Sequence, residues 1–134
     1  MPRTNAWTAG RPGAPLAAYD VISGATGLGR LLLARQHAHR THHALLTSAV
    51  DYLICLTDPV HVHGRTVPGW WTPDAPSLNR TASFPRGHVN LGLAHGIAGP
   101  PALLALARQR GITAPGRLVA RGGAVSFINR LFSP

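Results

Sequence analysis

The stretch NLGLAHGIAGPPALLALA, residues 90–107, contains one histidine and no charged residue. Whether this stretch crosses a membrane or forms a helix of a globular core decides the fold class. The uncharged run extends from Gly87 to Ala107, and 21 residues are enough to cross a bilayer core of about 30 Å. Its polar side chains, four glycines and Pro100–Pro101 pair would leave costly polar groups and broken backbone in lipid. We therefore expect no transmembrane segment here. The run instead predicts a helix that starts near Ile97 to Pro101 and ends before Gly111.

The composition is that of a globular chain with an unusual charge. With 134 residues and 45% apolar residues, one domain is expected. All 13 basic residues are arginine and all four acidic residues are aspartate, which gives a formal net charge of +9. No two arginines are adjacent, whereas nucleic-acid-binding proteins usually cluster their charge beside aromatic residues. We therefore expect no nucleic-acid partner.

The chain has a single cysteine, Cys55, so it cannot form an internal disulfide, which fits a reducing compartment. The first twenty residues contain no apolar core of signal-peptide length. These two features favour a cytoplasmic location. Cys55 stands in the apolar segment YLICLTDPV and is expected to be a small core residue.

Apolar spacing predicts an all-α fold. One helix is expected from Val21 to about His43, and a second from a cap at Thr41 through Leu56. Residues 59–86 contain five prolines and are expected to form a long irregular connection that covers a site or has a function of its own. Residues 1–15 are rich in proline and glycine and are expected to be a flexible lead-in.

Two segments repeat one pattern, in which a polar residue precedes Gly-x-x-Gly. Ser23-Gly24-x-x-Gly27 matches His95-Gly96-x-x-Gly99, 72 positions further along the chain. Both stand where a loop turns into an apolar helix, and glycine there allows close approach of the neighbouring backbone. The repeat suggests helical hairpins built on one plan.

Asp20 and His95 are the first candidates for chemistry. Histidine exchanges protons near neutral pH, and a neighbouring carboxylate fixes the orientation of the ring. If the two glycine turns face a common centre, the two side chains meet there. The alternative is a buried histidine bonded to a carbonyl group and an aspartate that initiates a helix.

Histidines are also concentrated in two other places. The segment HAHRTHH contains four of them, and VHVHG contains His61 and His63. On one continuous helix, His39 and His43 would be i, i+4 neighbours able to bind a metal. With no carboxylate or cysteine nearby, a solvated polar link between helices is the favoured interpretation, and no metal ligand is assigned.

Three segments resemble the lanthionine synthetase C-like cyclases. They are YDVISGATGLGRLLL (19–33), PGWW (68–71) and GHVNLGLAHGIAGPPALLALA (87–107), and the resemblance runs from about Leu16 to Gly116. It implies an α/α toroid that closes thioether rings by adding a peptide cysteine thiol to a dehydrated serine or threonine. It further implies that His95 donates or accepts the proton, that Asp20 is its acidic companion, and that the substrate is a dehydrated precursor peptide.

The resemblance also bears on substrate binding and on a metal. Trp70, Trp71 and Asn90 are the expected substrate-binding residues, although the tryptophans could instead pin the loop to the core. In the family, zinc is held by two cysteines and one histidine from later motifs of the type WCYG and CHG. Neither motif is present, so no zinc is expected in this chain.

These departures predict a fragment of a cyclase, all-α and forming only part of a toroid. Residues 16–116 would be the partial helical domain, and residues 117–134 a divergent basic tail, disordered or from a shifted reading frame. The isolated chain is expected to be inactive, with a dehydratase or a complementary cyclase chain as possible partners. The alternative is a non-catalytic peptide-binding or scaffold module of a modification complex.

Overall fold

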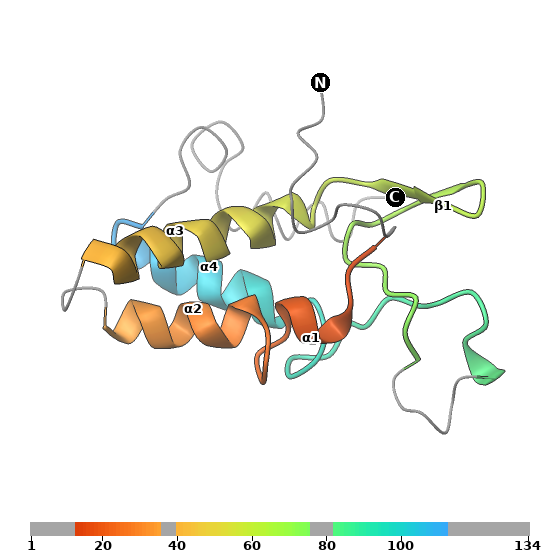
Figure 1. The fold of residues 1–134 in the computed structure, drawn as a ribbon, viewed down its shortest axis with the longest axis horizontal. Helices are drawn as coiled ribbons and strands as arrows, with labels where there is room; N and C mark the ends of the chain where they lie inside the picture. The colour runs from red at the N-terminus through yellow and green to blue at the C-terminus, as the bar shows by residue number, and fades with distance from the viewer. Residues whose placement is uncertain (1–12, 36–39, 76–81, 113–134) are drawn as a thin grey trace.

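The computed structural model describes residues 13–35, 40–75 and 82–112 (Figure 1). The elements in chain order are α1 (Leu16–Tyr19), α2 (Ala25–Ala34), α3 (Arg40–Cys55), β1 (Val60–Val62), β2 (Arg65–Val67) and α4 (Gly99–Gln109). This part of the chain is mainly helical, which confirms the all-α prediction. Closure into a toroid stays a prediction.

Three helices form the body of the fold. In Figure 1, α2 and α4 run in the same direction and α3 runs in the opposite direction. Helix α2 packs against both α3 and α4. Gly29 lies at this contact, because a Cβ placed there would meet the side chains of Leu103 in α4 and Ala49 in α3. A glycine at the centre of α2 therefore lets three helices approach closely.

Large apolar side chains from each helix fill the core. Leu46 and Leu53 of α3 and Leu104 of α4 are almost completely buried, and each contributes about 1.5–3 kcal/mol through burial. Tyr19, at the end of α1, is also fully buried, and its hydroxyl donates a hydrogen bond to the carbonyl oxygen of Trp70 at 3.4 Å. This bond joins the first helix to the connection between α3 and α4.

The helix expected to start at Val21 starts four residues later. Residues 21–24 form a turn, because the carboxylate of Asp20 takes the backbone N–H groups of Ser23 and Gly24 before α2 begins. The same helix ends at Ala34 rather than near His43, and α3 already includes Arg40. Thr41 thus lies inside the first turn of α3 and is not its cap. The expected second and third helices otherwise match α3 and α4 closely.

The connection expected to be irregular contains a β-hairpin. β1 and β2 are antiparallel, with Val60 opposite Val67 and Val62 opposite Arg65. The turn between them is made by His63 and Gly64, which both have positive φ angles of 49° and 74°. Two such residues form the tight turn that suits a two-residue hairpin. Further along the chain, an isolated bridge pairs Thr72 with His88.

Several expectations fall on other parts of the chain. Residues 1–12 of the predicted lead-in, His37, His39 and the whole predicted tail at 117–134 lie outside the described residues. At the end of the lead-in, Ala14 is buried and its N–H donates to the carbonyl oxygen of Trp71 at 2.8 Å. In the described part, no helix combines the length and the hydropathy needed to span a bilayer.

Candidate active site

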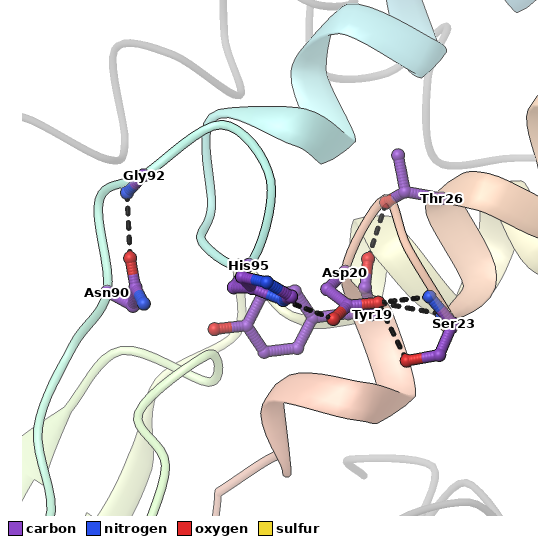
Figure 2. A network of polar contacts seen from close by, with 8 residues as sticks. Tyr19, Asp20, Ser23, Thr26, Asn90, Gly92 and His95 are labelled. Atoms are coloured by element: carbon purple, nitrogen blue, oxygen red, sulfur yellow. Dashed lines mark hydrogen bonds and ion pairs between the residues drawn. The ribbon is translucent and has the colours of Figure 1, made fainter. Parts of the chain in front are cut away.

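The carboxylate of Asp20 is the centre of the candidate site (Figure 2). Asp20 follows α1, and its side chain is only 4% exposed. Its Oδ1 accepts three hydrogen bonds, from the N–H and the hydroxyl of Ser23 at 2.7 and 3.1 Å and from the N–H of Gly24 at 2.8 Å. One carboxylate oxygen is thus occupied at the start of α2, where the helix dipole also favours a negative charge.

The other oxygen of Asp20 contacts His95. The Nδ1 atom of His95 lies 2.8 Å from Oδ2, although the two residues are 75 positions apart in sequence. An ionised carboxylate can only accept a hydrogen bond, so Nδ1 carries the hydrogen and donates it. In the neutral ring, Nε2 then has a free lone pair. The His95 side chain is 57% exposed, so Nε2 is open to a substrate.

Two opposing influences act on the acidity of Asp20. Burial alone would raise the pKa of its carboxyl group, but the hydrogen bonds from Ser23, His95 and Gly24 outweigh this effect and hold the pKa below its ordinary value. Asp20 is therefore ionised at neutral pH. It supplies a fixed negative charge beside the imidazole of His95.

The glycines of the two turns make matching close approaches to the backbone. A Cβ at Gly24 would collide with the amide nitrogen of Asp20, and one at Gly96 would collide with that of Gly92, four residues upstream in each case. In the same way, Gly27 lies against the carbonyl oxygen of Val21, and Gly99 lies against that of Leu93. The repeat found in the sequence is thus matched by equivalent close contacts of its glycines, while the backbone hydrogen bonds differ, since Gly27 donates to Asp20 and Gly99 donates to Gly96.

The turns also contact each other directly. The N–H of Val21 donates to the carbonyl oxygen of Ala94 at 2.9 Å, and a Cβ at Gly99 would collide with the side chain of Val21. The expectation that two glycine turns bring Asp20 and His95 together is therefore met in the geometry. The catalytic role of the pair remains a proposal.

Asn90 shapes the loop that carries His95. Its side-chain oxygen accepts a hydrogen bond from the N–H of Gly92 at 2.8 Å, and its carbonyl oxygen accepts one from the N–H of Ile97 at 2.9 Å. Figure 2 shows Asn90 and Gly92 across the loop from Asp20. The residue expected to bind substrate is thus placed to hold the His95 loop in shape.

Trp70 and Trp71 are both buried, at 4% and 7% exposure. Trp71 bonds to Ala14 through its backbone, and its ring lies against Gly13, Gly87 and His63. This burial favours the interpretation in which the two tryptophans pin the connection to the core. Little of either ring is available to a peptide.

The two loop segments that carry Asp20 and His95 share a set of exposed apolar side chains. We call it the apolar rim. It consists of Val21 and Ile22 in the first turn and Val89, Leu91 and Leu93 in the second loop. Leu91 and Leu93 are 61% and 65% exposed. Exposed apolar clusters usually mark interaction surfaces. The alternation of VNLGL in residues 89–93 was the available signal, because every second residue there is apolar.

The remaining histidines have other surroundings. His61 bonds to the hydroxyl of Thr66 at 2.9 Å, His63 packs edge-on against Trp71, and His42 contacts the carbonyl oxygen of Arg35. Within residues 13–35, 40–75 and 82–112, no group of three His, Cys, Asp or Glu side chains could hold a metal ion.

The family model described as lanthionine synthetase C-like protein matches residues 3–134. The chain belongs to the lanthionine synthetase C-like family. The match is wider than the range 16–116 over which the motifs were recognised, and it includes residues 117–134. A search of curated proteins finds no match.

The donor set of this family member does not fit the zinc implied by the resemblance. That set comprises two cysteines and a histidine, whereas Cys55 is the single cysteine among the 134 residues. Cys55 is half-buried at the end of α3 and belongs to no cluster of potential ligands in the described part of the chain. The structure thus brings Asp20 and His95 together, and its described residues include no group of side chains that could hold a zinc ion.

Proposed function

We propose that this chain supplies the proton-transfer part of a thioether-forming cyclase acting on a dehydrated precursor peptide. In this proposal α2 and α4 are inner helices of a toroid, with their glycine turns at the active-site end. The observation that carries the proposal is the contact of 2.8 Å between His95 Nδ1 and Asp20 Oδ2, which leaves Nε2 exposed.

The reaction balances with one imidazole. Nε2 of His95 takes the proton of the substrate thiol, and the sulfur adds to the β-carbon of the dehydrated residue. The electron pair of the C=C bond moves toward the α-carbon and the adjoining carbonyl group, forming an enolate. Nε2 then returns the proton to the α-carbon. The product is a thioether, and the histidine is neutral again. General acid–base catalysis of this kind contributes about 10²–10⁴-fold to a rate.

Asp20 supports each step without exchanging a proton itself. Its lowered pKa keeps the charge on the carboxylate, so a negative charge stays beside the ring of His95 during both transfers. Its hydrogen bond with Nδ1 also keeps the ring turned so that Nε2 faces outward.

The apolar rim is the proposed contact surface for the peptide. Its residues belong to the same two loop segments as Asp20 and His95, and their exposed side chains bear no charge, which suits an uncharged dehydrated residue and apolar neighbours. This surface takes the place of Trp70 and Trp71, whose rings are buried. The proposal also locates the chain in the cytoplasm, where a substrate thiol stays reduced.

We expect that proton removal by His95 does not by itself activate the thiol enough without a metal that binds the sulfur. A free thiol has a pKa of about 8.5, so most of it is protonated at neutral pH. Because the zinc donor set is missing, we expect no ring closure by the chain alone. A complementary cyclase chain carrying two cysteines and a histidine is the proposed partner, acting after a dehydratase.

The test is co-expression with such a complementary chain and a dehydrated peptide. Ring closure near pH 6.5 is followed by mass spectrometry after alkylation, because a thiol consumed in a ring no longer reacts with the alkylating reagent. We expect closure with the pair of chains, and a loss of about 10²-fold or more in rate with His95→Ala. His43→Ala is the matched control, because His43 is exposed on α3 and is not part of the site.

A non-catalytic peptide-binding module is the second candidate, and the apolar rim is the observation that favours it. It predicts that His95→Ala leaves ring closure by the assembled proteins unchanged. Ring closure by the wild-type chain on its own would contradict the proposal that a second chain must supply the zinc-binding residues.

A further inference from the structure

We propose that Ser23 is a positioning residue of the Asp20–His95 pair, holding the carboxylate so that one oxygen faces the imidazole. The role in catalysis rests on the proposed function, whereas the positioning itself rests on geometry alone. Ser23 does not face the exposed Nε2 of His95, so its effect on the reaction passes through Asp20.

The hydrogen bonds divide the two carboxylate oxygens between two groups of donors. Oδ1 receives the N–H and hydroxyl of Ser23 and the N–H of Gly24, and Oδ2 receives Nδ1 of His95. Rotation of the carboxylate would break all of these bonds together. The three donors on Oδ1 therefore fix the direction in which Oδ2 meets the ring.

The repeated turn gives an independent reason to place Ser23 in the site. Ser23 and His95 occupy the same position in the two turns, directly before Gly24 and Gly96. Both side chains donate to the carboxylate of Asp20, one to each oxygen, and Figure 2 shows Asp20 lying between them. The position before the glycine thus points toward one shared centre in each copy of the turn.

The hydrogen bond from the Ser23 hydroxyl to Asp20 is not needed to cap α2. The two backbone N–H groups already bond to Oδ1 at 2.7 and 2.8 Å, and they would remain if the side chain were alanine. The hydroxyl adds a third donor at 3.1 Å, from a residue that also lines a pocket of about 350 Å³ between α1, α2 and α3. Its removal should weaken the hold on the carboxylate and leave the helix start in place.

The experiment is an NMR titration of the folded chain, which needs no turnover. The carboxyl carbon of Asp20 and the ring nitrogens of His95 are followed in wild type, Ser23→Ala and Ser23→Thr. The titratable side chains that face Asp20 are His95 and Tyr19, and Tyr19 stays neutral throughout the acid range. We expect the Asp20 midpoint to rise in Ser23→Ala and to return toward the wild-type value in Ser23→Thr, which keeps the hydroxyl.

Ser48→Ala is the matched control. Ser48 lines the same pocket, but its hydroxyl donates to the carbonyl oxygen of Ala44 at 3.0 Å and not to Asp20. We expect this variant to leave the Asp20 midpoint and the His95 ring signals unchanged. Unchanged signals in Ser23→Ala, with a wild-type circular dichroism spectrum, would overturn the proposal. An equal shift in Ser48→Ala would overturn it as well.

The reconstituted enzyme gives a second readout. With the complementary chain present, Ser23→Ala should lower kcat about three- to tenfold, with KM for the peptide unchanged, because a positioning residue acts through Asp20 and not on the peptide. If the wild-type proteins close no ring, the proposed function fails while the titration still decides the role of Ser23. A higher KM with an unchanged kcat would contradict positioning.

Discussion

The N–H of Val21 bonds to the carbonyl oxygen of Ala94 at 2.9 Å, joining two turns that are distant in sequence. Each of these residues is the neighbour of a member of the candidate pair, Asp20 on one side and His95 on the other. The backbone bond and the side-chain contact thus form adjacent links between the same two loops. Disturbing one link should disturb the other.

Gly27→Ala is expected to break both links. The new Cβ would collide with the carbonyl oxygen of Val21, and backbone atoms cannot move away as a side chain can. We expect a loss of about 1–3 kcal/mol in the free energy of unfolding, measured by urea denaturation, and a changed His95 ring signal in NMR. The gain in helix propensity from alanine, about 1 kcal/mol, offsets only part of the loss.

Gly29→Ala is the matched control in the same helix. Its Cβ would meet a terminal methyl group of Leu103, which can rotate away. The steric cost is therefore smaller than at Gly27, while alanine brings the same gain in helix propensity. We expect Gly29→Ala to be clearly less destabilising than Gly27→Ala and to leave the His95 signal unchanged. A reversed order of the two variants would show that the contact between the turns is not rigid.

Asp20→Asn should reduce stability in a pH-dependent way. Because the folded-state pKa of Asp20 is lowered, ionised Asp20 stabilises the fold at every pH above its unfolded value of about 3.9. This contribution is lost as the pH falls below about 4 and passes through the folded pKa. We expect wild type to exceed Asp20→Asn by about 2 kcal/mol at pH 7, measured by urea denaturation, and the gap to shrink in acid.

The control for that measurement is Asp74→Asn, at an exposed position in the connection. It should change stability by no more than about 0.5 kcal/mol at either pH. A gap between wild type and Asp20→Asn that persists undiminished at low pH would show that the charge of Asp20 is not its source.

The two tyrosines should resist ionisation until the protein unfolds. Burial raises the pKa of Tyr52 to about 12, and burial raises the pKa of Tyr19 further still. Since unfolded tyrosine ionises near pH 10, the unfolded state is favoured progressively above that pH, and stability falls. Tyr19 and Tyr52 are the only tyrosines in the sequence, so absorbance at 295 nm reports both.

We expect that absorbance to stay flat through pH 10 and then to rise in one step together with the loss of helical circular dichroism. An ordinary titration centred at pH 10 in the folded protein would contradict the burial of these side chains. The same titration in urea gives the reference for the unfolded chain.

Leu91→Asn and Leu93→Asn test the apolar rim. Both leucines are more than half exposed in the segment that precedes His95, so their replacement should cost little stability. We expect each to weaken binding of an unreactive serine-containing analogue of the peptide about three- to tenfold, measured by isothermal titration calorimetry. Leu31→Asn is the control, because Leu31 is 53% exposed on α2 and lies outside the rim. Equal effects at all three positions would argue against a specific peptide surface.

The sequence predicted the elements with regular apolar spacing. The helix expected up to Leu56 is α3, and the one expected from near Ile97 to before Gly111 is α4. The start of α2 could not be predicted from apolar spacing. It depends on hydrogen bonds from the N–H groups of Ser23 and Gly24 to the side chain of Asp20, and such bonds do not change the spacing of apolar residues. The β-hairpin was missed because histidine occupies a turn position with positive φ, where glycine or asparagine would have been a clearer signal.

The candidate site was predicted in part. The repeated Gly-x-x-Gly pattern correctly indicated that Asp20 and His95 would meet. The positions of Trp70 and Trp71 were harder to predict, because a tryptophan serves equally well as a buried anchor or as a binding surface, and only packing distinguishes the two. Ser23 was noticed as part of the pattern, but its bond to Asp20 depends on a turn that the helix prediction had placed inside α2.

Oδ1 of Asp20 binds donors at the start of α2, and Oδ2 binds His95. This difference affects which of the two residues is kept as related chains accumulate mutations. A residue whose side chain stabilises the start of a helix is kept for folding, even in a related chain without catalytic activity. Asp20 would therefore persist in an inert relative, whereas the exposed ring of His95 contributes little to the fold and would be lost quickly. Under the proposed function, the histidine rather than the aspartate is the residue that marks a retained proton-transfer site.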